Sequence, residues 1–197
     1  MHINSTLPKK ILAWYDNSKR ILPWRVSKKS PKKQYYRLLS EFMLQQTQVK
    51  TVIPYFNNFT KKFKNLKALS NSNEREILKM WEGLGYYRRA RNLLACSKLL
   101  VKNYDSKLPT TLKQMKKLPG IGDYTGNALL GLVYNLPTIA VDGNVKRVIS
   151  RLLNKEEKKI NFNKFIDKNK KILFSSNRNA DFVEALMEFG ALVCKPK

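Results

Sequence analysis

The sequence predicts an all-α protein of about ten helices. Apolar residues recur with helical spacing along nearly the whole chain, whereas the alternating pattern of β-strands is almost absent. Turn-forming residues separate the periodic segments. The chain has 197 residues, 43% of them hydrophobic and 27% charged, which is typical of a globular protein with a substantial core. We expect one large domain or two small lobes.

Ten segments carry the helical period. They are residues 8–19, 33–48, 52–63, 74–81, 88–104, 111–117, 124–133, 143–153, 162–173 and 180–193. Ser72, followed by Arg75 and Glu76, is the expected start of the fourth helix. The charged cluster 155–159 is expected to be a solvated loop.

Charge is the most informative bulk property of the chain. The formal net charge is +25, which favours a polyanionic partner such as nucleic acid. Lys, Asn and Ile are abundant together, as an AT-rich genome produces, so some of the lysines are background.

Membrane and secretion signals are absent from the sequence. The most apolar stretch, residues 128–141, is too short to cross a bilayer. The first residues, 1–5, do not show the charged head and apolar run of a secretory signal. Two cysteines make no disulfide framework, and Cys96 lies in an apolar pattern typical of a core residue. We therefore expect a reducing compartment such as the cytoplasm.

The segment Leu118-Pro119-Gly120-Ile121-Gly122 lies between two predicted helices. Glycine permits left-handed backbone angles and close approach of another backbone. The first N–H groups of the second helix have no partner within that helix and can bind a phosphate oxygen. A plain helix–turn–helix corner is the alternative, but the full motif in so basic a chain favours phosphate binding. Asp123 places a negative charge beside that phosphate unless its side chain turns aside.

Two carboxylates are candidates for chemistry. Asp142 follows an apolar segment and precedes a helix, so it is expected to be an N-cap, a role compatible with stabilising a positive charge. Glu41 lies in a mostly apolar helix and would have a raised pKa if it were half-buried. From the pattern alone, a surface glutamate on an amphipathic helix is the simpler interpretation. Lys146 and Arg147, one turn beyond Asp142, are expected to contact a nucleic-acid backbone.

Two further segments have the composition of a nucleic-acid surface. Amides and Thr47 gather in residues 45–48, at a predicted helix end, where they could enter a DNA groove. Residues 81–91 combine aromatics, glycines and three arginines, which suits stacking and phosphate contact. Core aromatics beside a basic helix face would explain part of the second pattern equally well.

Taken together, the motifs resemble the helix-hairpin-helix DNA glycosylase superfamily, which has the endonuclease III-like fold. Within it the chain is most similar to adenine DNA glycosylases of the MutY type. The matching segments are residues 22–25, 40–49, 83–93, 118–122, 141–148 and 190–194, in order along nearly the whole chain.

The resemblance implies removal of adenine mispaired with 8-oxoguanine or guanine in double-stranded DNA. Glu41 would protonate adenine, Asp142 would stabilise the sugar cation, and Asn144 would support Asp142. Tyr124 stands where relatives that cut the strand have a lysine, which implies a monofunctional enzyme or a weak lyase.

The resemblance also assigns contacts. The base pocket would include Trp24, Arg25 and Leu44. The duplex would be contacted by residues of the hairpin, of segments 45–48 and 81–91, and of the helix after Asp142, namely Gln46, Thr47, Tyr86, Arg88, Arg91, Leu118, Gly120, Gly122, Lys146 and Arg147.

Cys194 is the main departure from the family pattern. In the family a cysteine here is the first of four that hold a [4Fe–4S] cluster, but only Lys195-Pro196-Lys197 follow it. One thiolate cannot hold such a cluster. We expect a truncated sequence, with a cluster-free lineage as the alternative.

The predicted architecture has two helical lobes with the DNA cleft between them. Residues 25–135 would form a six-helix lobe with the hairpin, and residues 1–24 would pack with 136–197 in the second, with Glu41 and Asp142 facing each other. Two alternatives stay open: a related glycosylase acting on oxidised pyrimidines or mismatched thymine, and a truncated, non-catalytic DNA-binding form. Tyr124 and the amides of 45–48 disfavour the first alternative.

Overall fold

The computed structural model describes residues 3–196, and every regular element in this range is a helix. The all-α prediction is confirmed. The α-helices are α1 (Leu7–Ser18), α2 (Lys33–Leu44), α3 (Val49–Lys62), α4 (Leu66–Ser70), α5 (Glu74–Trp81), α6 (Arg88–Asn103), α7 (Leu112–Met115), α8 (Asp123–Tyr134), α9 (Gly143–Leu153), α10 (Phe162–Lys168), α11 (Lys170–Leu173) and α12 (Asn179–Leu192). A 3₁₀ turn, η1, covers Glu157–Lys159. Within the described range, no helix has the length and apolar character needed to cross a membrane.

The chain divides into two compact units. Unit 1 consists of Met1–Arg20 and Leu130–Lys197, and unit 2 of Ile21–Leu129. The boundaries expected from the sequence, after residues 24 and 135, lie a few residues beyond these. Each unit is described below by itself.

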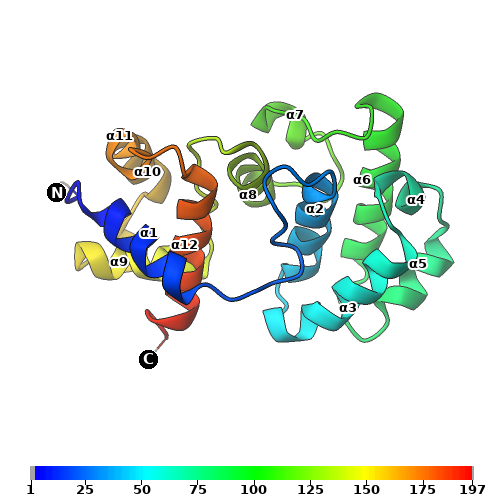
Figure 1. Ribbon diagram of the computed structural model, residues 1–197, viewed down its shortest axis with the longest axis horizontal. Coiled ribbons are helices and arrows are strands. Elements are labelled where there is room, and N and C mark those ends of the chain that lie inside the picture. Colours follow the sequence, from blue (N-terminus) through cyan, green and yellow to red (C-terminus); the bar gives the residue numbers. More distant parts are fainter. Residues whose placement is uncertain (1–2, 197) are drawn as a thin grey trace. The chain divides into compact units, whose positions relative to one another are not determined.

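In unit 2, α6 packs against α2, α4 and α5, and α3 packs against α2 and α5 (Figure 1). The core is made of large side chains that are almost fully buried, among them Leu39, Phe42, Phe59, Trp81 and Leu93. The ring of Phe59 meets Trp81 edge-on at a centroid distance of 5.8 Å. This packing holds the C-terminal end of α2 beside the N-terminal half of α6, where the candidate DNA-contacting segments begin.

In unit 1, α12 packs against both α1 and α9 (Figure 1). Phe182 and Val183 of α12 are fully buried. The Tyr15 hydroxyl donates a hydrogen bond to Glu184, and the Arg20 guanidinium pairs with Glu188 at 2.7 Å. Polar contacts therefore join α1 and the residues just after it to α12, in addition to the apolar core.

Several predicted boundaries are wrong. Helix α2 ends at Leu44 rather than at residue 48, and Asn169 interrupts the predicted helix 162–173 between α10 and α11. Helix α4, with Asn65 as its N-cap, was not predicted. The cap of α5 is Asn73, which forms a capping box with Glu76, rather than Ser72.

Candidate functional site

The predicted hairpin is formed by α7, the turn 118–122 and α8. Leu118 and Ile121 are buried, so the turn is anchored to the core of unit 2. Gly120 has φ +78°, and a Cβ there would lie 2.6 Å from Phe42 Cε1 and 2.8 Å from Asn92 Cβ. Glycine is thus required at position 120 both by the backbone and by packing.

Gly122 is in a different environment. A Cβ at this position would meet no heavy atom within 4 Å, and its φ is not positive. It directly precedes α8, whose first N–H groups have no intrahelical partner. No side chain therefore blocks access to the first N–H groups of α8 at Gly122.

Asp123, the first residue of α8, is paired within the hairpin. Its Oδ1 lies 2.7 Å from Lys116 Nζ, and its side chain is exposed. The negative charge of Asp123 is therefore opposed by Lys116.

Asp142 is the N-cap of α9, as predicted. Its Oδ1 accepts a hydrogen bond from the Val145 backbone N–H at 2.7 Å, and its Oδ2 accepts one from Asn144 Nδ2 at 2.9 Å. The two donors, one on each oxygen, fix the orientation of the Asp142 carboxylate at the N-terminal end of the α9 dipole.

The Arg147 guanidinium holds the other side of Asn144. Its Nη2 donates to Asn144 Oδ1 at 2.8 Å and to the Gly190 carbonyl at 2.7 Å. Its Nε donates to the Cys194 carbonyl at 2.6 Å. In the structure Arg147 thus joins α9 to α12 and its C-terminal end, a positioning role that the sequence did not suggest.

Lys146 and Cys194 are also placed in unit 1. The Lys146 ammonium lies 5.9 Å from the centroid of the Phe162 ring. Cys194 Sγ accepts a hydrogen bond from Arg151 Nη1 at 3.2 Å. The other cysteine, Cys96, is fully buried in unit 2. A [4Fe–4S] cluster takes four thiolates, so the described residues of unit 1 do not by themselves fit one.

Glu41 lies on α2 and is only 7% exposed. The interpretation of Glu41 as a surface residue of an amphipathic helix is therefore wrong. Close by along the chain, Gln45 Nε2 donates to Thr125 Oγ1 at 3.3 Å, which joins the end of α2 to the first turn of α8. Tyr124, beside Thr125, is partly exposed.

The expected base-pocket residues differ in burial. Trp24 is almost fully buried and meets the Phe56 ring edge-on at a centroid distance of 5.3 Å, so it belongs to the core of unit 2. Arg25 and Leu44 are half-buried.

The expected duplex contacts of unit 2 are largely accessible. Gln46, Tyr86, Arg88 and Arg91 are exposed, and Thr47 is half-buried. Arg91 forms an ion pair with Glu74 at 2.7 Å.

Arg89 is a residue that sequence reasoning missed. It is buried, on the α6 face that also buries Leu93 and Ser97. Its spacing of four from Leu93 was the available signal, since side chains at i and i+4 share a helix face.

Comparison with known proteins decides the family. A family model described as "HhH-GPD superfamily base excision DNA repair protein" matches residues 39–170. The chain belongs to this superfamily. The matched range contains the hairpin, Glu41 and Asp142.

Within the superfamily, several similar curated proteins have the same name. The chain is 42% identical to "Adenine DNA glycosylase" of Buchnera aphidicola subsp. Baizongia pistaciae over 193 residues, which cover 93% of the chain and 52% of the relative. It is 35% identical to the Homo sapiens protein of that name, covering 95% of the chain and 36% of the relative. The chain thus spans about half, or less, of the length of these two relatives.

Solved structures agree on the fold. One titled "Structure of a thermostable thymine-DNA glycosylase" superimposes with a TM-score of 0.83 at 26% identity, covering 98% of this chain and 88% of that one. An endonuclease III–DNA covalent intermediate superimposes with a TM-score of 0.76 at 19% identity, covering 99% and 90%. The prediction of an endonuclease III-like fold is confirmed.

Proposed function

We propose that this chain removes adenine mispaired with 8-oxoguanine or guanine from double-stranded DNA. Relatives named adenine DNA glycosylase, at 35–42% identity, support this substrate. The observation that carries the chemistry is the Asp142 carboxylate, which hydrogen bonds from Val145 and Asn144 orient at the start of α9.

The reaction begins with extrusion of adenine from the duplex, at a cost of a few kcal/mol. Glu41, a buried acid, protonates the base, and the glycosidic electron pair leaves with the neutral adenine. Asp142 stays ionised and stabilises the positive charge that develops on the sugar. Water then adds to the sugar carbon and loses a proton. One neutral acid at the base and one anion at the sugar divide the work, as in other glycosidic cleavages.

Tyr124 determines what happens to the strand in this proposal. A phenol cannot form the Schiff base with the sugar that a lysine amine forms. Borohydride is therefore expected to trap little protein–DNA adduct, and strong trapping would contradict monofunctional chemistry.

A single-turnover panel tests the substrate and the acid together. Duplexes with adenine opposite 8-oxoguanine, adenine opposite guanine, thymine opposite guanine and thymine glycol are incubated with excess protein. We expect adenine release only, and a loss of at least about a hundredfold in Glu41→Gln, as is typical of general-acid removal. Glu157→Gln, in the exposed η1 turn of unit 1, is the matched control. Adenine release that survives Glu41→Gln unchanged would refute the role of Glu41.

Mismatched thymine is the second candidate substrate, because a thymine-DNA glycosylase superimposes closely on this chain. Its 26% identity is lower than that of the adenine glycosylases, so adenine is the better supported base. Thymine excision without adenine excision in the panel would reverse this choice. No excision by the wild type would favour a non-catalytic DNA-binding form.

The proposed partner is duplex DNA, bound by a monomer in the bacterial nucleoid. Because the net charge is +25, we expect affinity to fall steeply with salt as phosphate contacts release counterions. A flat salt response would contradict this electrostatic binding. A [4Fe–4S] cluster would need cysteines beyond the two in these 197 residues.

A further inference from the structure

The buried Arg89 guanidinium connects two separate segments of unit 2. Its Nη1 donates to the Met43 carbonyl at 2.7 Å and to the Gln45 carbonyl at the end of α2. Its Nη2 donates to the carbonyls of Leu84 at 3.0 Å and Gly85 at 3.1 Å, in the loop between α5 and α6. Nη1 thus bonds only the end of α2, and Nη2 bonds only the loop between α5 and α6.

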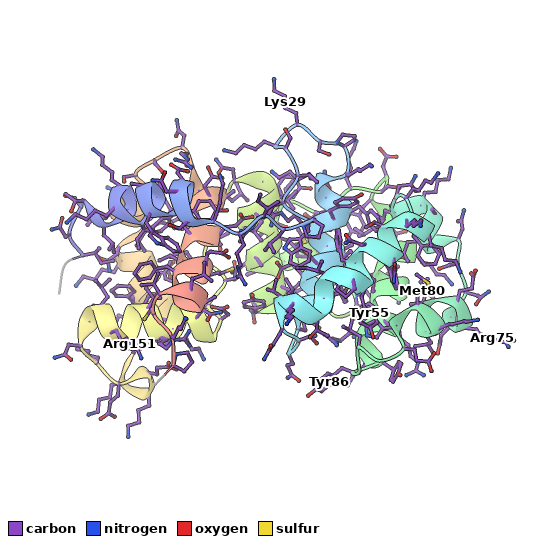
Figure 2. All side chains as sticks on the ribbon, turned by 60° about the horizontal axis from the view of Figure 1, so that its bottom comes forward. Lys29, Tyr55, Arg75, Met80, Tyr86 and Arg151 are labelled. Atoms are coloured by element: carbon purple, nitrogen blue, oxygen red, sulfur yellow. The ribbon has the colours of Figure 1, made fainter. Side chains whose placement is uncertain are left out.

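In each segment, the residue after the last bonded carbonyl is in an unusual conformation. Gln46 follows Gln45 and has φ 56°, and Tyr86 follows Gly85 and has φ 49°. Residues other than glycine rarely adopt positive φ, and they keep it only when surrounding contacts impose it. Both side chains are exposed, and Figure 2 shows Tyr86 projecting from its unit.

Aromatic rings complete the environment of Arg89. The guanidinium carbon lies 5.4 Å from the Trp81 ring centroid and 5.3 Å from that of Tyr86. Trp81 Nε1 also donates to the Gly85 carbonyl at 3.0 Å. The guanidinium is therefore fixed by its ring contacts as well as by its hydrogen bonds.

We infer that Arg89 is a positioning residue that holds Gln46 and Tyr86 as a preset pair for entry into the duplex. The role of that pair in DNA rests on the proposed function, whereas the coupling of the two segments does not. A planar guanidinium has donors in a rigid fork, so one group fixes two segments at a constant separation. A lysine ammonium is a point charge on a flexible stem and cannot reproduce this geometry.

Arg89→Lys is the direct test, because it keeps the charge and loses the fork. Arg75→Lys, at an exposed position of α5, is the matched control. In the free protein, we expect amide hydrogen exchange to accelerate about tenfold in peptides 44–48 and 83–88 of Arg89→Lys, with core peptides unchanged. Unchanged exchange in both peptides, or acceleration throughout unit 2, would overturn the inference.

A second measurement follows the pair on DNA. A duplex with 2-aminopurine in place of the target adenine becomes more fluorescent when that base is extruded. We expect Arg89→Lys to reduce the extrusion rate about tenfold, because contacting groups displaced by less than about 1 Å should cost less than the roughly hundredfold loss of a full 1 Å misplacement. In a variant that already has Gln46→Ala and Tyr86→Ala, Arg89→Lys should cause no further loss. The same tenfold loss in that background would show that Arg89 does not act through the pair.

Tyr86→Gly gives a test that does not depend on the stability of Arg89 variants. This substitution increases the conformational freedom of the loop between α5 and α6, and it removes the Tyr86 ring that contacts the Arg89 guanidinium. If Arg89 couples the segments, exchange in peptide 44–48 should rise at least about threefold, and no change there would overturn the coupling. Extrusion of 2-aminopurine without release of adenine by the wild type would refute the proposed function. Slower extrusion by Arg89→Lys would then still support the role of Arg89.

Discussion

Replacing Gly190 by alanine should disturb the Asp142 site from the opposite helix. A Cβ at position 190 would lie 2.5 Å from Asn144 Cβ and 2.9 Å from the Asn144 backbone Cα and O. Backbone atoms cannot rotate away, so α9 and α12 must separate by about 1 Å to reach ordinary van der Waals contact. Overpacking of this kind destabilises by about 1–3 kcal/mol, against a gain of about 1 kcal/mol in helix propensity. We therefore expect a net loss of up to about 2 kcal/mol.

The same separation stretches the hydrogen bonds around Asn144. Arg147 Nη2 bridges the Gly190 carbonyl and Asn144 Oδ1, and Asn144 in turn orients Asp142. A misplacement of about 1 Å in a catalytic group can lower the rate about a hundredfold. Adenine release in single turnover should therefore fall far more than the loss of stability alone would explain.

Urea unfolding and single-turnover adenine release measure the two effects of Gly190→Ala. The matched control is Gly143→Ala, because a Cβ at that first residue of α9 meets no heavy atom within 4 Å. The control should keep stability to within about 0.5 kcal/mol. If Gly190→Ala matched the control in both assays, the close crossing of α9 and α12 would not position Asp142.

Three further predictions concern other parts of the structure. Arg20→Met removes the guanidinium that pairs with the buried Glu188 carboxylate and keeps the backbone N–H that also donates to it. The loss should destabilise by about 2 kcal/mol in urea unfolding, and an unchanged midpoint would contradict this. Asp123→Asn removes the negative charge that pairs with Lys116 at the hairpin. Duplex binding should become about threefold tighter at low salt. Weaker binding would show instead that the ion pair orders the turn. Burial raises the pKa of the Cys96 thiol to about 12. At pH 8 a thiol reagent should therefore modify Cys96 only after the protein unfolds. Rapid modification of Cys96 in the folded protein would contradict its burial.

Helices with a long apolar period were predictable, and their ends were less so. The predicted second helix continued to residue 48. Glutamine has a good helix propensity, so local propensity does not indicate an end at Leu44. In the structure α2 ends at Leu44, and the Arg89 guanidinium bonds the carbonyls of its last turn instead. That contact joins residues far apart in sequence, so no local pattern could reveal it. Asn169 ends α10 by bonding the Phe165 carbonyl through its side chain, a competition that helical periodicity does not register.

The candidate site was predictable where its contacts join residues that are close together in the sequence. Asp142 as an N-cap was correct, because the acceptor and the Val145 N–H are three residues apart. Glu41 was misjudged as a surface residue, because burial depends on which helices cover that face of α2. The role of Arg147 depends on carbonyls of Gly190 and Cys194, more than forty positions away. Such contacts require the fold.

The two glycines of the hairpin show how one motif can combine two physical requirements. Gly120 is needed by the protein, since its φ is +78° and a side chain would strike Phe42 and Asn92. Gly122 is not needed by the fold, since nothing lies near an added Cβ. A methyl group there would instead occupy the space through which a phosphate reaches the first N–H groups of α8. Alanine at 120 should therefore lower stability, whereas alanine at 122 should leave unfolding unchanged and weaken duplex binding. Equal effects of the two substitutions on unfolding would remove the structural reason for assigning phosphate binding to Gly122.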